Sequence, residues 1–223
     1  GPVKNPNRWL IYGLGMAVLA LGITLNTKTG LGVSPIISVS YCLSQIFHWN
    51  FGDMTFLLYV VFVAVQLFLR DRGERAATLM QVVVSLIFSR LLNLCDAMIP
   101  YQGEAYGLTV NLAVLALAIF LTGLGVAMTV NMRLAPNPGD GIVQAIAEKI
   151  GRDQGFTKNV FDVGCVSVTA AVGLCFAGRV VGIGIGTLAA MVGVGRAIAL
   201  VNHFYQEKML AAAGMLPAGH GKV

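Results

Sequence analysis

The sequence predicts an all-α polytopic membrane protein with six transmembrane helices plus two re-entrant half-helices, arranged as two inverted-topology repeats. Three observations lead to this fold class. Of the 223 residues, 57% are hydrophobic and only 11% are charged, whereas soluble domains carry about 25% charged residues. The charged residues gather in short clusters between long apolar segments. The strings "GLGVSPIISVS" and "RLAPNPGDGIV" each follow a long apolar segment with a break rich in glycine and proline.

Six segments approach the roughly 20 apolar residues that a membrane-spanning helix needs. They cover residues 9–27, 54–70, 76–98, 107–131, 157–178 and 181–205. Two further stretches, 34–48 and 138–150, have a helical pattern but are too short to cross a bilayer. We therefore expect these two stretches to be re-entrant half-helices, which enter the membrane and return to the side from which they came.

The basic residues predict the orientation, because cytoplasmic loops are enriched in Lys and Arg. With six spans, both termini and nearly all basic clusters fall on one side, whereas 49–55 and 99–107 on the other side contain no Lys or Arg. Lys28 and Arg179 are the exceptions. The clusters on the predicted cytoplasmic side contain Lys4, Arg8, Arg70, Arg72, Arg75, Lys149, Arg152, Lys158, Lys208 and Lys222.

An internal repeat relates the two halves of the chain. A shift of 103 residues places Gly22 on Gly125, Leu31 on Leu134, Pro35 on Pro138 and Gly52 on Gly155, and a three-residue change then places Arg90 on Arg196. The predicted segments are an N-terminus 1–8 with a cloning scar at its start, repeat 1 over 9–100, repeat 2 over 107–206, and a cytoplasmic tail 207–223. Because each repeat contains three spans, the second enters the membrane from the opposite side.

The starts of the two half-helices form the candidate binding site. Ser34 and Asn137 are suitable N-cap residues, and Pro35 and Pro138 fit the first helical turn. A helix start offers unpaired N–H groups and a partial positive charge, so two starts that meet near the midplane suit an anionic group. The neighbouring glycines, Gly32 and Gly139, and Asp140 belong to the same candidate site. In the alternative, both helices simply lie in the membrane interface.

Charged residues inside predicted spans add to this hypothesis, because such charges are costly and often functional. Arg90 and Arg196 favour an anionic substrate, unless each reaches the nearer interface or pairs locally, as Arg90 could with Asp96. Asp140 opposes a simple anion and suits a cation or the amine of a zwitterion. Asp162 is a candidate for proton or ion coupling, or pairs with Lys158 four residues earlier.

Several function classes are disfavoured. The cysteines and histidines form no metal-binding pattern, so we expect no metal and no cofactor. No nucleophile and base occur in a recognisable catalytic motif, so we expect no enzyme. The net charge of +5 is explained by cytoplasmic loops, and we expect no nucleic acid partner.

The strings "LGVSPI", "NPGDGIV" and "GIGTLAAMVGVGRAIAL" resemble the YczE/YyaS/YitT family of bacterial membrane proteins, over about residues 10 to 205. The resemblance implies a multi-pass protein of the bacterial inner (plasma) membrane, without known enzymatic chemistry and commonly supposed to transport a solute. We expect no soluble C-terminal domain such as some YitT-type members carry, and the chain resembles the YczE-type branch more closely.

These features together predict a secondary transporter or facilitator for a small organic anion or zwitterion. The alternatives are a substrate-binding subunit of a larger transport complex and an aquaporin-like channel. The expected partners are the lipid bilayer, the small-molecule substrate and, in view of the small chain and its glycine-rich last spans, a second copy in a homodimer.

Overall fold

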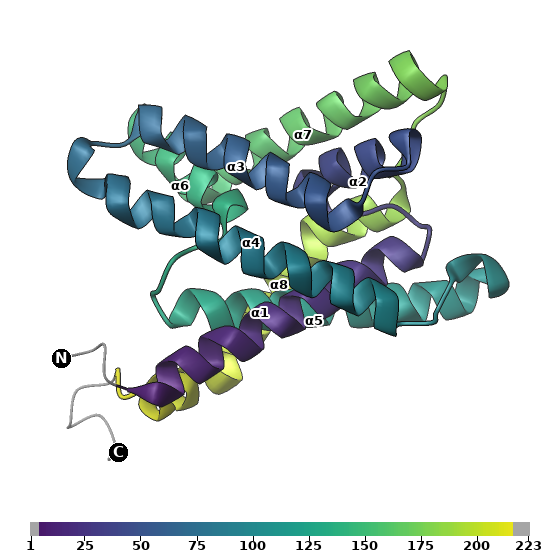
Figure 1. The fold of residues 1–223 in the computed structure, drawn as a ribbon. Coiled ribbons are helices and arrows are strands. Elements are labelled where there is room, and N and C mark those ends of the chain that lie inside the picture. The colour runs from purple at the N-terminus through teal and green to yellow at the C-terminus, as the bar shows by residue number, and fades with distance from the viewer. Residues whose placement is uncertain (1–4, 216–223) are drawn as a thin grey trace.

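The chain is helical throughout the part that the structure describes. The computed structural model describes residues 5–215, and this range holds eight α-helices and no β-strand (Figure 1). The helices are α1 (Pro6–Lys28), α2 (Pro35–Phe47), α3 (Phe51–Leu69), α4 (Arg75–Met98), α5 (Leu108–Asn131), α6 (Pro138–Ile150), α7 (Gln154–Ala177) and α8 (Ile185–Ala212). The predicted cloning scar, Lys4, Lys222 and the end of the predicted tail lie outside the described residues. The all-helical prediction is confirmed.

Six of the helices are long and apolar enough to cross a membrane, namely α1, α3, α4, α5, α7 and α8. Large apolar side chains cover their outer surface. Phe68 on α3 is 90% exposed and Leu188 on α8 is 66% exposed, which a soluble monomer rarely tolerates over a wide surface. The protein is therefore a multi-pass membrane protein, and the six predicted spans correspond to six membrane-capable helices.

Polar caps fix where several helices begin. The side chains of Asn5, Asn50, Asn137 and Asp153 each accept a hydrogen bond from a backbone N–H in the first turn of the helix that follows. Because Asn50 caps α3, this helix begins at Phe51, three residues before the predicted start of that span. The two short helices begin and end within one residue of the predicted boundaries.

The predicted start of the last span is wrong. Residues 181–184 form an extended loop, and α8 begins only at Ile185. Gly182 has a φ of +87°, which interrupts a helix. The Thr187 hydroxyl then accepts a hydrogen bond of 3.2 Å from the Gly184 N–H at the start of α8. The helix also continues to Ala212, beyond the predicted end of the span.

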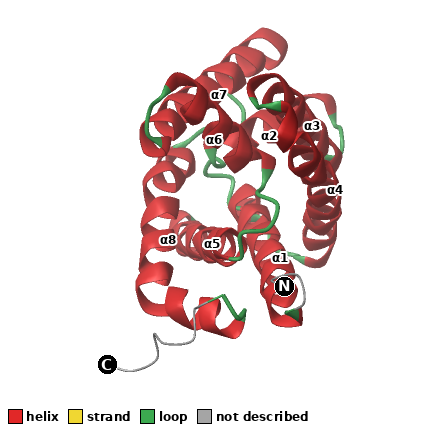
Figure 2. Ribbon diagram, turned by 90° about the vertical axis from the view of Figure 1, so that its left-hand side faces the viewer, coloured by secondary structure: helices red, strands yellow, loops and turns green. Residues whose placement is uncertain are grey.

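The central contact of the fold joins α1 to α5, and glycines make it close. A Cβ added at Gly22 would lie 2.6 Å from the Thr122 backbone nitrogen, and one at Gly125 would lie 2.5 Å from the Leu19 nitrogen. Small residues allow helices in membranes to approach in this way. Figure 2 shows α1, α5 and α8 grouped together, with α2, α3, α6 and α7 in a second group beside them.

The two short helices meet at their own N-terminal ends, between the two groups of helices. The helix α2 packs against α7, and α6 packs against α3. In Figure 1, α6 lies toward the end of the molecule where α1 begins and α8 ends, and α2 lies toward the opposite end. Their starts meet in between, since a Cβ added at Gly139 would lie 3.5 Å from Cδ1 of Ile36.

Candidate functional site

A cavity of about 110 Å³ lies where the short helices meet, bordered by α1, α5, α7 and α8. It brings together most of the residues that the sequence predicted for the site, namely Ser34, Pro35, Asn137, Gly139, Asp140 and Asp162. A larger groove of about 460 Å³ between α2, α3, α6 and α7 is lined almost entirely by apolar side chains. A further pocket of about 400 Å³, lined by Arg133, Gln144 and Gln154 among others, shares Asn137 and Asp140 with this cavity. The cavity of about 110 Å³ is the candidate site because the starts of both short helices line it.

Asn137 builds the start of α6. Its Oδ1 accepts a hydrogen bond of 2.8 Å from the Gly139 N–H, as the predicted N-cap requires. Its Nδ2 lies 3.3 Å from the hydroxyl of Tyr59, to which it donates. Tyr59 comes from α3 and is only 3% exposed. Sequence reasoning missed Tyr59, because an aromatic residue within an apolar span gives no local sign of a long-range polar contact.

The start of α2 is held from α1. Asn26 donates from Nδ2 to the Gly32 carbonyl oxygen at 3.0 Å, and its Oδ1 accepts from the Ser34 N–H at 3.2 Å. The expected Ser34 side-chain cap is absent, because Asn26 rather than the Ser34 hydroxyl organises this turn. The Ser34 side chain instead lines the cavity. Asn26 was also missed, although a polar residue close to the end of an apolar span was a usable signal.

Gly32 and Pro138 do not line this cavity. Gly32 has a φ of +105° and packs directly against Gly184 at the start of α8, so a side chain at this position would clash with backbone. Pro138 is buried and faces a separate small space beside Tyr59. Gly32 shapes the turn before α2, and Pro138 forms the first residue of α6.

The charged side chains of the cavity are Asp140, Lys158 and Asp162. Asp162 is 2% exposed, and its Oδ2 forms an ion pair of 2.9 Å with Nζ of Lys158, one turn earlier on α7. The pairing that the four-residue spacing predicted is thus confirmed. The second carboxylate oxygen, Oδ1, is buried without a hydrogen-bond partner among the described residues.

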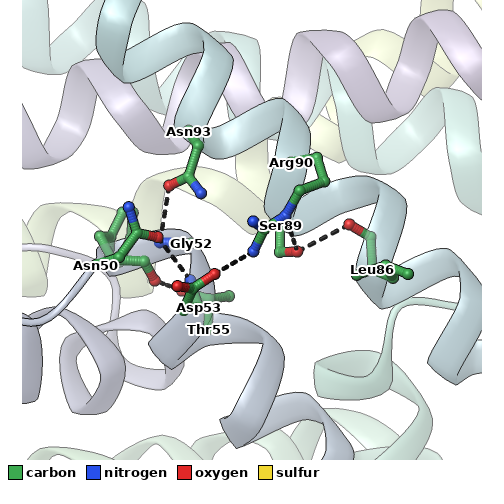
Figure 3. Close-up of polar contacts among 9 residues, drawn as sticks. Asn50, Gly52, Asp53, Thr55, Leu86, Ser89, Arg90 and Asn93 are labelled. Carbon is green, nitrogen blue, oxygen red and sulfur yellow. Dashed lines mark hydrogen bonds and ion pairs between the residues drawn. The ribbon is translucent and has the colours of Figure 1, made fainter.

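The two arginines expected at the site do not reach the cavity. Arg90 is half-exposed on α4 and forms an ion pair with Asp53 in the first turn of α3 (Figure 3). Asp96, the local partner considered for Arg90, instead pairs with Lys28 at 3.3 Å. Arg196 lies exposed on α8. The depth of each arginine within its span could be predicted from the sequence. Which side of the helix faces the cavity could not, because it depends on how the helices pack.

The contacts around Arg90 fasten α4 to the start of α3. Figure 3 shows Oδ1 of Asn93 accepting a hydrogen bond of 3.1 Å from the Gly52 N–H, while Arg90 Nε donates to the Ser89 hydroxyl at 3.3 Å. Asn50 caps the same turn by accepting from the Asp53 N–H. This cluster joins two helices and is separate from the cavity.

Together, the six membrane-capable helices and their exposed apolar surfaces define a multi-pass membrane protein, in which the starts of the two short helices line a small cavity. Residues 6–203 match a family of unknown function, DUF6198, and the chain belongs to this family. The chain is similar to the uncharacterized membrane protein YczE of Bacillus subtilis (strain 168), with 27% identity over 154 residues that cover 68% of each chain.

A second relative is the uncharacterized protein YyaS of the same organism. It is 24% identical over 181 residues, which cover 81% of this chain and 85% of YyaS. The resemblance to YczE-like proteins expected from the short motifs is thereby confirmed. No solved structure matches the chain.

Proposed function

We propose that the protein is a carrier, a secondary transporter or facilitator that moves a small organic anion or zwitterion across the bacterial plasma membrane. The observation that carries this proposal is that the first turns of α2 and α6 line one cavity, together with Asp140, Lys158 and Asp162, at the point where the helices meet. Helix starts attract anionic groups, and non-helical backbone at membrane depth is tolerated only around protein or a water-filled cavity.

We further propose that α1–α4 and α5–α8 are inverted repeats, with α2 and α6 as re-entrant half-helices. The packing supports this relation. When each helix of one repeat is replaced by its counterpart in the other, a packed helix pair becomes another pair that is also packed. The pair α2–α7 becomes α6–α3, and α1–α4 becomes α5–α8, while α1–α5 is its own counterpart. Such repeats are common in transporters, which place their substrate at the repeat interface.

One pair of contacts breaks this symmetry and favours a carrier over a channel. The helices α3 and α4 pack closely, whereas α7 and α8 share no comparable contact. Gln66 and Gln81 join α3 to α4 through two reciprocal amide hydrogen bonds of 2.9 and 3.0 Å. A close helix contact in one repeat that is missing from the other is the kind of asymmetry that alternating access requires of a carrier.

The repeat positions support this reading. The 103-residue shift places Gln66 on Thr169, and the shift that relates Arg90 to Arg196 places Gln81 on Thr187. Thr169 is hydrogen-bonded at 2.8 Å to Ser38 on α2 rather than to α8. In the opposite state of the carrier, we propose that α7 and α8 close together while α3 and α4 separate.

The orientation proposed from the basic residues is consistent with the packing. Arg8 at the start of α1 donates to the backbone oxygens of Met132 and Arg133 at the end of α5. Arg70 follows α3 and Lys149 lies in the last turn of α6, and both helices run toward this same end. We propose that this end, with both termini, faces the cytoplasm.

Uptake into proteoliposomes tests the proposed function. Vesicles containing the full chain are mixed with iso-osmotic solutions of small carboxylates, amino acids, ammonium salts and polyols, and solute entry is followed by light scattering as the vesicles swell. We expect saturable entry of one group of small anions or zwitterions, absent from protein-free vesicles. Non-saturating entry together with fast water flow indicates a channel, and no entry of any solute overturns the proposal.

A further inference from the structure

We infer that the cavity is built for a small zwitterion, whose ammonium group binds Asp162 and whose anionic group binds the starts of α2 and α6. This inference rests on the proposed function and names the class of substrate. It also gives Asp162 the role of binding the substrate directly.

The first observation is the unsatisfied carboxylate oxygen. Asp162 is 2% exposed, and Lys158 occupies only its Oδ2. Its Oδ1 is buried with no hydrogen-bond partner among residues 5–215, although the side chain lines the cavity. A buried acceptor left in this state is costly. An ammonium group supplies the missing N–H donor and an attractive charge, whereas a carboxylate or phosphate supplies neither.

The second observation is that the starts of both short helices offer hydrogen-bond donors, in contrast to the carboxylate of Asp162. Ser34 and Asn137 occupy the N-cap positions of α2 and α6, and both line the same cavity as Asp162. The N–H groups of a first turn lack intrahelical acceptors. The Ser34 hydroxyl forms no capping bond, so it is available as a further donor. This part of the cavity suits an anionic group.

The overall charge of the cavity points to a ligand that carries both signs. Two carboxylates, Asp140 and Asp162, face one ammonium, Lys158, so the side chains sum to one negative charge. Each helix start contributes roughly half a positive charge, which brings the total close to zero. A simple anion would meet two carboxylates, and a simple cation would meet two positive helix starts. A zwitterion satisfies both regions.

The small volume and the lining of the cavity favour a compact ligand. Its volume of about 110 Å³ is small, and apolar side chains of α1, α5 and α8 such as Ile23, Val126 and Met191 complete the wall. We therefore assign a compact zwitterion with a short aliphatic body, in which the ammonium and the anionic group are separated by only a few atoms.

Binding to the detergent-purified full chain tests the inference independently of transport. Thermal unfolding and calorimetric titration are measured with four probes, namely glycine, alanine, acetate and methylammonium, in choline buffer and again in sodium buffer. We expect glycine or alanine to bind at least about tenfold more tightly than acetate or methylammonium, because only the zwitterions use both regions. Equal binding of acetate overturns the inference.

Three variants test whether Asp162 binds the ammonium group of the ligand. Asp162→Asn is expected to weaken zwitterion binding about tenfold or more while leaving acetate binding unchanged. Asp71→Asn, an exposed carboxylate in the α3–α4 connection, is the matched control and is expected to bind like the parent. Lys158→Gln makes the cavity more negative and is expected to shift the preference toward methylammonium, which supplies a second readout if Asp162→Asn does not fold.

The outcomes separate this inference from the proposed function. If the swelling assay finds a transported anion that binds equally to the parent and to Asp162→Asn, the carrier stands and the zwitterion inference fails. If sodium alone stabilises the parent but not Asp162→Asn, Asp162 binds a coupling ion and the inference again fails. If no solute is transported, the proposed function fails, whatever the binding data show.

Discussion

Asn26 and Tyr59 illustrate how single side chains position the cavity. Asn26 reaches from α1 to the turn before α2, and Tyr59 reaches from α3 to Asn137 at the start of α6. Each is a buried polar group whose partner lies on a different element. Since the starts of α2 and α6 form one part of the cavity wall, residues that orient those starts control its shape as directly as residues that line it.

Replacing Tyr59 by Phe removes one hydrogen bond and keeps the aromatic ring packed against Phe88. We expect the Tyr59→Phe protein to lose about 1 kcal/mol of unfolding free energy and to bind the transported solute more weakly. Denaturant titration of the purified protein and the concentration dependence of uptake measure these two effects. Tyr41→Phe, which keeps its edge contact with Phe51, serves as control. Identical uptake by both variants would show that Tyr59 does not position the site.

The exposed arginines are expected to tolerate substitution. Arg90 and its partner Asp53 are both about half exposed, and surface ion pairs of this kind contribute roughly 0–1 kcal/mol. We expect Arg90→Gln and Arg196→Gln to retain the uptake rate and substrate preference of the parent, in contrast to Asp162→Asn. A large loss of uptake in either arginine variant, with normal stability, would return these residues to the binding site.

At the scale of elements, the contact between α1 and α5 depends on the absence of side chains. Gly22 lies against the backbone of Thr122, whereas Gly13, on the same helix, has nothing within 4 Å of an added Cβ. We expect Gly22→Ala to destabilise the protein by about 1–3 kcal/mol and Gly13→Ala to have little effect. Thermal unfolding of both variants measures the difference, and equal stability would contradict the close approach.

The short helices show which parts of the structure could be predicted from sequence. Their starts were predicted because Ser-Pro and Asn-Pro are local signals, and α6 ends at Gly151, which has the left-handed φ typical of a C-cap. The late start of α8 was missed because an apolar sequence conceals the loop around Gly182. The partners of Arg90 and Asn137 were missed because they depend on helix rotation and long-range packing, which a single apolar pattern does not encode.

At the scale of the whole molecule, if the protein is the carrier proposed above, the Gln66–Gln81 pair is expected to bias it toward the state described. Leucine at either position leaves the other buried amide without its partner, which costs about 1–3 kcal/mol. We expect the double Leu variant to lose less unfolding free energy than the two single variants lose together, because each single substitution already removes the same Gln66–Gln81 interaction. Unfolding measurements on the four proteins of this cycle test the coupling.

The same variants are expected to change access to the cavity. A cysteine placed at Ser34, after removal of the four native cysteines, reports labelling by a membrane-impermeant thiol reagent added to either side of proteoliposomes. We expect Gln66→Leu to change the ratio of labelling between the two sides, since α3 and α4 then separate more easily. An unchanged ratio, with the coupling intact, would make the pair structural only.

The close fit between α1 and α5 also governs how the protein is made. The surface of α1 that contains Gly22 is synthesised before its contact partner, Thr122, which lies about 100 residues later in the chain. At about 5–20 residues per second of synthesis, this delay is roughly 5–20 seconds. During that interval the nascent N-terminal half is in the membrane with its main contact surface uncovered. Insertion factors that shield a newly made helix from premature partners are therefore expected to be more important for this chain than for bundles whose neighbouring helices pair in order.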